Sequence, residues 1–145
     1  QRAGSTDVLE IHGSLIRARC VTDGDIVEDW RRVEEFPPRC PCGSLLRPDV
    51  VWFGETLPPG AIEMAMTWVF ESDLVIVAGT SAVVAPASLL PGFARQRGVP
   101  IIEINPQETP LSPVATLHLQ GRAGELLPRI IGEEGTSERS GGFAE

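Results

Sequence analysis

Apolar residues in the second half of the chain fall into short continuous runs that alternate with stretches of helical spacing. The runs are "DLVIVAGTS" (73–81), "VPIIEINP" (99–106) and the shorter "TLHLQG" (116–121). Continuous apolar runs of this length, bounded by Gly, Pro and Asn, are typical of strands buried on both faces of a parallel sheet. The pattern therefore predicts three strands at these positions.

The stretches between the runs predict helices. Residues 58–72 carry apolar side chains at helical spacing behind a Pro-Pro pair, 86–98 end at a glycine, and 123–132 contain an internal proline. Strands that alternate with helices predict the α/β class. We expect a partial Rossmann-like parallel sheet with helices on both faces.

The first half of the chain has a different pattern. Residues 7–14 ("DVLEIHGS") alternate like a short strand, and 49–53 ("DVVWF") read as a buried strand. Between them, residues 17–48 hold all three cysteines and many acids, which predicts a small, loop-rich, zinc-ribbon-like insertion. We expect 1–16 and 49–131 to form the Rossmann-like domain, and 132–145 to be a disordered tail.

Composition narrows the possible functions. The net charge is −8 and all 12 basic residues are Arg, which argues against direct nucleic-acid binding. The absence of Lys excludes Schiff-base chemistry and a phosphate-loop lysine. No apolar run reaches the roughly 18 residues that a membrane helix needs. The polar start does not resemble a signal peptide, so we expect a cytoplasmic protein that does not contact a membrane.

Polar residues follow the predicted strands at their carboxyl ends, where parallel sheets bind ligands. Gly79, Thr80 and Ser81 could bind phosphate or ribose oxygens, or the loop could only cap the next helix. Asn105 could bridge two ribose hydroxyls, or it could form an Asx turn before Pro106. His12 is suited to a general base, although a lone histidine is more often structural.

The cysteines form an incomplete zinc-ribbon pattern. Cys40 and Cys42 are one residue closer than the usual C-x2-C spacing, and Cys20 has Asp23 where a second thiolate would stand. Oxygen can ligate zinc, so Asp23 is a possible fourth ligand. A ribbon that has lost its metal is the alternative.

Taken in order, these pieces resemble the sirtuin family of NAD-dependent protein lysine deacylases, of bacterial or archaeal type. The matching stretches are "QRAG", "LEIHGSL", "ARC", "CPCGSLLRPDVVWFGETLP", "VIVAGTSAVVAPAS", "IIEINP" and "GRAGELLP". The resemblance covers residues 1 to about 131. It implies transfer of an acyl group from lysine to ADP-ribose, with release of nicotinamide, on protein or peptide substrates.

The resemblance also implies a role for each matching residue. His12 is the implied base, and Gly13 is implied to leave room for the ribose. The implied NAD-binding residues are Gly79, Thr80, Ser81, Val84, Asn105, Pro106, Gln107 and Ala123. The implied acyl-lysine-binding residues are Val51, Phe53, Gly54 and Glu55. The implied zinc ligands are Cys20, Cys40 and Cys42, with Asp23 at the fourth position.

The family's Gly-rich G-A-G-x-S loop and Gln-Asn-x-Asp segment do not occur in this sequence. We therefore expect the chain to be the carboxyl-terminal part of a longer enzyme, with little or no turnover by itself. A non-catalytic NAD- or ADP-ribose-binding module is the alternative. A third possibility is a structural zinc-ribbon protein that binds a partner through its acidic insertion. This possibility would not explain the motifs at the strand ends.

Overall fold

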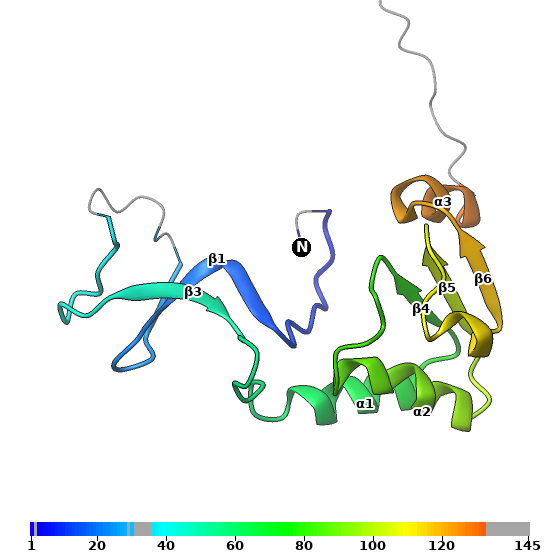
Figure 1. Ribbon diagram of the computed structural model, residues 1–145, viewed down its shortest axis with the longest axis horizontal. Coiled ribbons are helices and arrows are strands. Elements are labelled where there is room, and N and C mark those ends of the chain that lie inside the picture. The colour runs from blue at the N-terminus through cyan, green and yellow to red at the C-terminus, as the bar shows by residue number, and fades with distance from the viewer. Residues whose placement is uncertain (2, 29, 31–35, 133–145) are drawn as a thin grey trace, which may run out of the picture. The chain divides into compact units, whose positions relative to one another are not determined.

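The computed structural model describes residues 1, 3–28, 30 and 36–132, which fall into two compact units (Figure 1). The first unit covers residues 1–65 and the second covers residues 66–145. Most of the predicted disordered tail lies outside the described residues. The predicted domain boundaries at residues 16/17 and 48/49 stay predictions.

The first unit is built on a three-stranded antiparallel sheet of order β2-β1-β3. Its strands are β1 (Gly13–Cys20), β2 (Ile26–Val27) and β3 (Leu46–Val50). The register of β1 against β3 shifts between Ser14 and Ala18, which marks a bulge or irregularity. Two of the three cysteines lie in the small core beneath this sheet, with Ala18, Leu46, Val27 and Trp30 packed around Cys20 and Cys40.

The second unit contains the parallel sheet that the apolar runs predict. Its strands are β4 (Val75–Ala78), β5 (Ile101–Asn105) and β6 (Leu117–Gln120), in the order β4-β5-β6. Both neighbouring pairs are parallel. Ile101 and Ile104 of the central strand are fully buried. The prediction of an α/β fold with a parallel sheet is confirmed.

The predicted helices are also present, with shorter ends. They are α1 (Ala61–Glu71), α2 (Leu90–Gln96), which a short 3-10 helix (Ala87–Leu89) precedes, and α3 (Ala123–Ile130). Pro91 stands in the first turn of α2, where a missing N–H costs no helical hydrogen bond. Helix α2 contacts β4 and β5, and α3 contacts β5.

Two predicted strands of the first half are wrong in position. Residues 7–12 contain no strand, and β1 begins only at Gly13. The apolar stretch 49–53 is not a buried strand, because β3 ends at Val50 and the side chains of Trp52 and Phe53 are 56% and 96% exposed. Strand β3 also pairs with β1 in the antiparallel sheet, so this stretch does not extend the parallel sheet.

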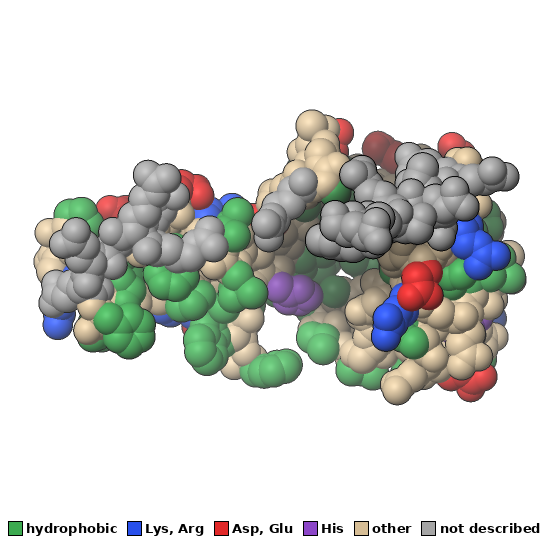
Figure 2. Space-filling view, turned by 90° about the horizontal axis from the view of Figure 1, so that it is seen from above, with side chains coloured by type: hydrophobic (Ala, Val, Ile, Leu, Met, Phe, Trp, Pro, Cys, Tyr) green, Lys and Arg blue, Asp and Glu red, His purple; other side chains and the backbone are tan. Residues whose placement is uncertain are grey.

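Apolar side chains reach the surface at several places (Figure 2). Among the described residues, no helix is both long enough and apolar enough to cross a membrane.

Candidate functional site

Four potential metal ligands meet at one end of the antiparallel sheet. The ligand atoms of Cys20, Asp23, Cys40 and Cys42 all lie within 4.8 Å of one another. Cys20 is the last residue of β1, and a turn closed by the hydrogen bond from Gly24 N–H to the carbonyl of Cys20 returns Asp23 toward it. A second turn does the same for Cys40 and Cys42.

The distances within this cluster fit a tetrahedral zinc site. Zinc–sulfur bonds of about 2.3 Å place two tetrahedral ligand atoms roughly 3.8 Å apart. The Sγ atoms of Cys20 and Cys42 are 3.6 Å apart, close to that separation and far beyond a disulfide bond. The cysteines are free thiols. Three thiolates and one carboxylate at these positions would hold a structural zinc ion and close the ribbon.

The thiols of the cluster are electrostatically unequal. Hydrogen bonds from the side chain and backbone of Ser44 lower the pKa of Cys42, and Cys20 adds to this effect. A backbone hydrogen bond from Cys42 lowers the pKa of Cys40, but burial and the neighbouring thiols outweigh it and raise that pKa to about 11. Bonds from Cys20 and the backbone of Asp25 lower the pKa of Asp23. The cluster therefore keeps its carboxylate charged.

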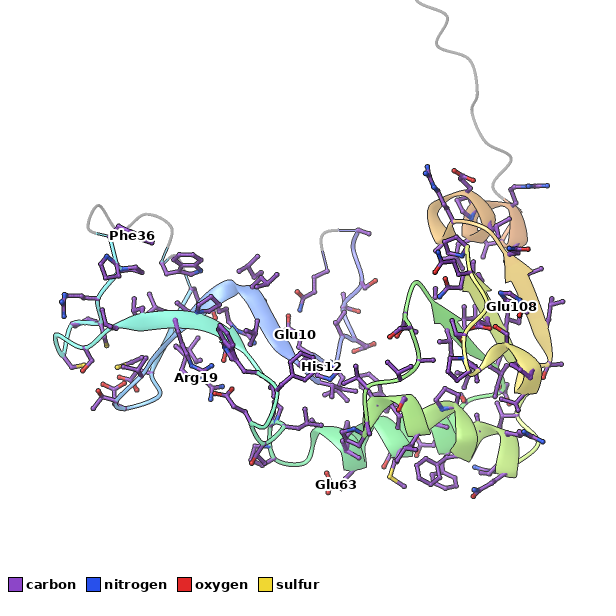
Figure 3. All side chains as sticks on the ribbon, viewed as in Figure 1. Glu10, His12, Arg19, Phe36, Glu63 and Glu108 are labelled. Atoms are coloured by element: carbon purple, nitrogen blue, oxygen red, sulfur yellow. The ribbon has the colours of Figure 1, made fainter. Side chains whose placement is uncertain are left out.

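His12 stands in an exposed turn directly before β1 (Figure 3). Its carbonyl accepts a hydrogen bond of 3.0 Å from the backbone N–H of Val51. Within the described part of the chain its imidazole makes no hydrogen bond or ion pair, so the ring is available to a substrate. The backbone contact places the predicted base next to the predicted peptide-binding stretch.

Gly13, which follows His12, has a left-handed backbone with φ of +76°. A Cβ atom at this position would lie 2.1 Å from the carbonyl oxygen of Asp49. The close approach of β1 to β3 therefore requires a glycine here. This requirement is separate from the implied space for a ribose.

The predicted peptide-binding residues form an exposed turn after β3. The backbone N–H of Glu55 donates to the carbonyl of Trp52 over 3.0 Å. The Glu55 carboxylate accepts from the backbone N–H of Trp52, also over 3.0 Å. That N–H lowers the pKa of Glu55, and the guanidinium of Arg47 adds to the effect. Phe53 and Gly54 stand at the exposed tip of this turn.

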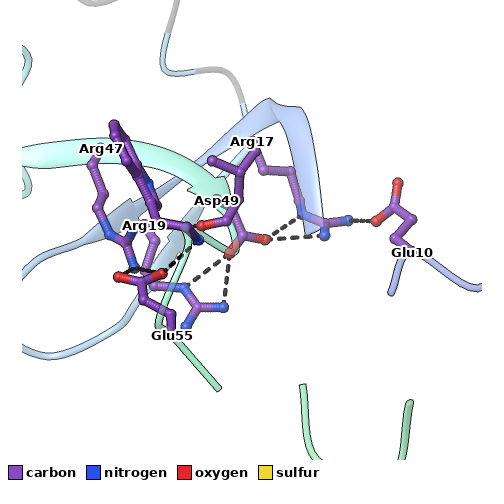
Figure 4. Close-up of polar contacts among 8 residues, drawn as sticks. Glu10, Arg17, Arg19, Arg47, Asp49 and Glu55 are labelled. Atoms are coloured by element: carbon purple, nitrogen blue, oxygen red, sulfur yellow. Dashed lines mark hydrogen bonds and ion pairs between the residues drawn. The ribbon is translucent and has the colours of Figure 1, made fainter. Parts of the chain in front are cut away.

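Ion pairs connect this turn to the sheet and surround Asp49 of β3 (Figure 4): Arg47 of β3 pairs with Glu55 over 3.0 Å, and Asp49 pairs with two arginines of β1. The buried carboxylate of Asp49 accepts hydrogen bonds from Nε of Arg17 over 3.1 Å and from Nε of Arg19 over 2.9 Å. The Nη2 atoms of the same arginines form ion pairs with it over 3.0 and 2.7 Å, and Arg17 also pairs with Glu10 over 2.7 Å. Two charge-assisted hydrogen bonds and these ion pairs compensate the desolvation of Asp49. Burial lowers the pKa of Arg17, but Asp49 and Glu10 outweigh it and raise that pKa.

Sequence reasoning missed this network. The pattern that could have revealed it is the spacing of two residues between Arg17 and Arg19, and again between Arg47 and Asp49. Alternate residues of a strand point to the same face of a sheet, so the members of each pair share a face. The side chains line a hollow of about 720 Å³, which residues 55–59 also border.

In the second unit, the polar residues after β4 and β5 lie together. The side chain of Asn105 donates from Nδ2 to the carbonyl of Thr80 over 2.6 Å. Gly79 N–H donates to the carbonyl of Ile104 over 3.1 Å. Gln107 follows Asn105 by two residues and donates its N–H to Oδ1 of Asn105 over 3.2 Å. The two strand-end motifs therefore form one edge of the sheet.

The sequence left open an Asx turn at Asn105 and a helix-capping role for the Gly-Thr-Ser loop, and these contacts bear on both. The bond from Gln107 to Asn105 is an Asx turn, so that interpretation of Asn105 is confirmed. The amide still has one hydrogen and one lone pair for a ligand. The capping alternative for the Gly-Thr-Ser loop is wrong, because the next helix has Pro86 at its N-cap and no side-chain cap. Instead, Thr80 Oγ1 accepts the N–H of Ala82 over 3.2 Å.

The remaining predicted NAD-binding residues are distributed around this edge. Ser81, Val84 and Pro106 are exposed, and Ala123 is half-buried at the first position of α3. The side chain of Gln120 donates to the carbonyl of Pro106 over 3.2 Å, which ties the end of β6 to the loop after β5. His12 and the peptide-binding residues belong to the other unit.

The fold and these sites define a class of protein. It has a Rossmann-like parallel sheet with polar, potentially ligand-binding residues at the carboxyl ends of its strands, and a small zinc-ribbon-like unit with a cluster of potential metal ligands. A model of the Sir2 family matches residues 1–86. The chain belongs to the Sir2 family.

Individual relatives agree with this assignment. An NAD-dependent protein deacylase of Pyrobaculum aerophilum is 50% identical over 134 residues, covering 92% of this chain and 54% of that protein. The NAD-dependent protein deacylase Sir2 of Mycolicibacterium smegmatis is 47% identical over 137 residues, covering 90% of this chain and 57% of that protein.

Solved structures give the same result. A Sir2 homologue in complex with NAD matches with a TM-score of 0.81 and 51% identity, covering 90% of this chain and 52% of that one. Sir2Tm bound to a propionylated peptide matches with a TM-score of 0.81 and 36% identity, covering 91% and 58%. The chain thus spans about half the length of the relatives it matches.

Proposed function

We propose that this chain is the carboxyl-terminal part of an NAD-dependent protein lysine deacylase, a deacetylase or desuccinylase that transfers the acyl group to ADP-ribose and releases nicotinamide. The observation that carries the proposal is the hydrogen bond between Val51 and the carbonyl of His12. It holds an exposed imidazole beside an exposed turn in which Phe53 and Gly54 make no hydrogen bond with other described residues. Relatives named as NAD-dependent protein deacylases support the assignment.

In this proposal the two units supply different parts of the reaction. NAD supplies the ribose that receives the acyl group. His12 would remove a proton from a ribose hydroxyl, a task that suits a neutral imidazole, since histidine is the commonest general base in enzymes. The proposed NAD-binding residues are Gly79, Thr80, Ser81, Val84, Asn105, Pro106, Gln107 and Ala123. The amide hydrogen and lone pair of Asn105 that bond no described residue would be available to ribose hydroxyls.

The acyl-lysine peptide is proposed to bind as an extended segment along Val51, Phe53, Gly54 and Glu55. Zinc held by the cysteine cluster is proposed to be structural, since its site would be closed by four protein ligands. We further propose a cytoplasmic location, which free thiols and a need for NAD support.

Replacement of His12 tests the assignment of the base. In a version of the protein extended upstream, His12→Ala should lower the deacylation rate by about 10²-fold or more, because general-base catalysis contributes that much. NAD affinity, measured by calorimetry, should stay within about twofold. A thermal melt that matches the unsubstituted protein shows that the fold is kept. An unchanged rate would remove His12 from the mechanism.

A further inference from the structure

The turn that follows β3 is closed by its own glutamate. The Glu55 carboxylate accepts the N–H of Trp52 through Oε2, while the Glu55 N–H donates to the Trp52 carbonyl. Both polar groups of the Trp52 backbone are thus occupied by one residue. The carboxylate points back onto its own turn, so it is engaged before any ligand arrives.

Arg47 holds this carboxylate from the neighbouring strand. Its Nη2 lies 3.1 Å from Oε2 and 3.0 Å from Oε1 of Glu55, and its Nη1 donates to the carbonyl of Val50 over 3.4 Å. Arg47 therefore contacts both the beginning and the end of the segment 50–55. Strand β3, which carries Arg47, is fixed to β1 by the antiparallel ladder.

The same contacts determine which backbone N–H and carbonyl groups of residues 50–55 have no hydrogen-bond partner among the described residues. Val51 donates its N–H to His12, and Trp52 is paired with Glu55. Phe53 and Gly54 make no hydrogen bond with other described residues, and the Phe53 side chain is 96% exposed. An extended peptide could add its main-chain bonds only to such unpaired groups.

We propose that Arg47 and Glu55 form a clamp that presets the turn 51–55 for an extended acyl-lysine peptide. Both are positioning residues: Glu55 orders the turn rather than contacting the peptide, and Arg47 orders Glu55. Because the turn is already ordered in the free protein, less conformational entropy is lost when a peptide binds to it, and the peptide binds more tightly. The inference rests on the proposed function of this site, and it changes the role of Glu55 within it.

The clamp differs from an ordinary surface ion pair in a way that substitution can detect. Exposed pairs contribute little, because solvent screens them and their side chains lose entropy. Here the decisive contact is the bond from Trp52 N–H to a carboxylate, and bonds to charged groups are among the stronger ones. Glu55→Gln keeps an oxygen acceptor, whereas Glu55→Ala keeps none.

Steady-state kinetics of the upstream-extended protein on an acetyl-lysine peptide tests the positioning role. Glu55→Ala and Arg47→Met should each raise the KM for the peptide, by about tenfold or more for Glu55→Ala, the size of one charge-assisted hydrogen bond. Glu55→Gln should have a smaller effect. The kcat and the KM for NAD should stay within about twofold in all three. A peptide KM unchanged in Glu55→Ala overturns the proposal.

A charge swap provides the sharpest comparison. Arg47→Glu combined with Glu55→Arg restores an ion pair, but a guanidinium has no acceptor for the Trp52 N–H. The swap should therefore fail to restore the peptide KM, and full restoration would show an ordinary ion pair in place of a clamp. The control is Glu125→Gln, which removes an exposed carboxylate 3.7 Å from Arg122 in the other unit. It should leave the peptide KM unchanged.

Amide hydrogen exchange of the 145-residue chain tests the clamp without any enzymatic activity. Exchange of the Trp52 amide should accelerate about tenfold or more in Glu55→Ala, because its acceptor is removed. Faster exchange in this chain, together with an upstream-extended protein that is folded but shows no deacylation, would contradict the proposed function and retain the clamp. Unchanged exchange would overturn the clamp itself, whatever the kinetics show.

Discussion

At the scale of single residues, backbone geometry explains why certain residue types stand at positions whose role was ambiguous from side-chain chemistry alone. The Asx turn at Asn105 and the bond from Ala82 to Thr80 show that both strand-end motifs first organise their own loops. The Asx turn was among the possibilities offered by the sequence, but the bond from the Asn105 side chain to the Thr80 carbonyl was not, because it joins the ends of two neighbouring strands. Gly13 is the clearest case, since its neighbour is Asp49 of another strand.

Replacing Gly13 should strongly destabilise the first unit. Gly13→Ala incurs the strain of a left-handed residue, about 1–2 kcal/mol, and places Cβ 2.1 Å from the Asp49 carbonyl oxygen. We expect the free energy of unfolding to fall by about 3 kcal/mol or more, measured by urea denaturation. The matched control is Gly60→Ala, which has the same φ of +76° and no atom within 4 Å of the added Cβ.

The control should cost only about 1 kcal/mol, the strain of the backbone alone. Equal losses in the two variants would mean that β1 and β3 can separate at this point at no cost. The close approach of the two strands would then not explain the glycine.

At the scale of secondary-structure elements, prediction succeeded where one pattern covered a whole element. Strands β4, β5 and β6 lie within the apolar runs, and glycine or proline bounds each of them. The sequence pattern did not predict strand β1, because apolar and polar residues alternate imperfectly in "GSLIRARC" and its pairing with β3 shifts along the strand. Its arginines are stabilised by Asp49 of β3, 30 and 32 residues away along the chain, and no local sequence pattern predicts such a contact.

The ribbon is the element whose sequence pattern was most ambiguous, and its metal content is directly measurable. Elemental analysis should find about one zinc per chain, because four ligand atoms lie within 4.8 Å. Cys40→Ser should lose the metal. Asp23→Cys should retain it longer against a chelator, since structural zinc sites favour sulfur.

The control for the ribbon is Asp25→Ala, which removes a neighbouring acid outside the ligand set and should keep the zinc. Folded protein that contains no zinc would favour the metal-free ribbon. In that case Cys20 and Cys40 would serve only as small core residues, since Cys42 is exposed.

At the scale of the whole molecule, the family assignment depends on order and spacing, and no single motif carries it. Relatives that are 41–50% identical match over 92% of this chain, so the likeness extends across the strand-end motifs, the ribbon and the turn after β3 together. The chain spans about half the length of those relatives. The proposed activity on NAD and an acyl-lysine peptide is therefore to be measured on a longer polypeptide.

The central claim is tested most directly by an NAD-dependent deacylation assay on acetyl- and succinyl-lysine peptides. The 145-residue chain is assayed beside a version extended upstream to the length of its relatives. We expect NAD-dependent loss of the acyl group and release of nicotinamide from the extended version, with little or no turnover by the shorter chain. No turnover by either protein, with the extended version folded and NAD bound, would contradict the account and favour a non-catalytic NAD-binding module.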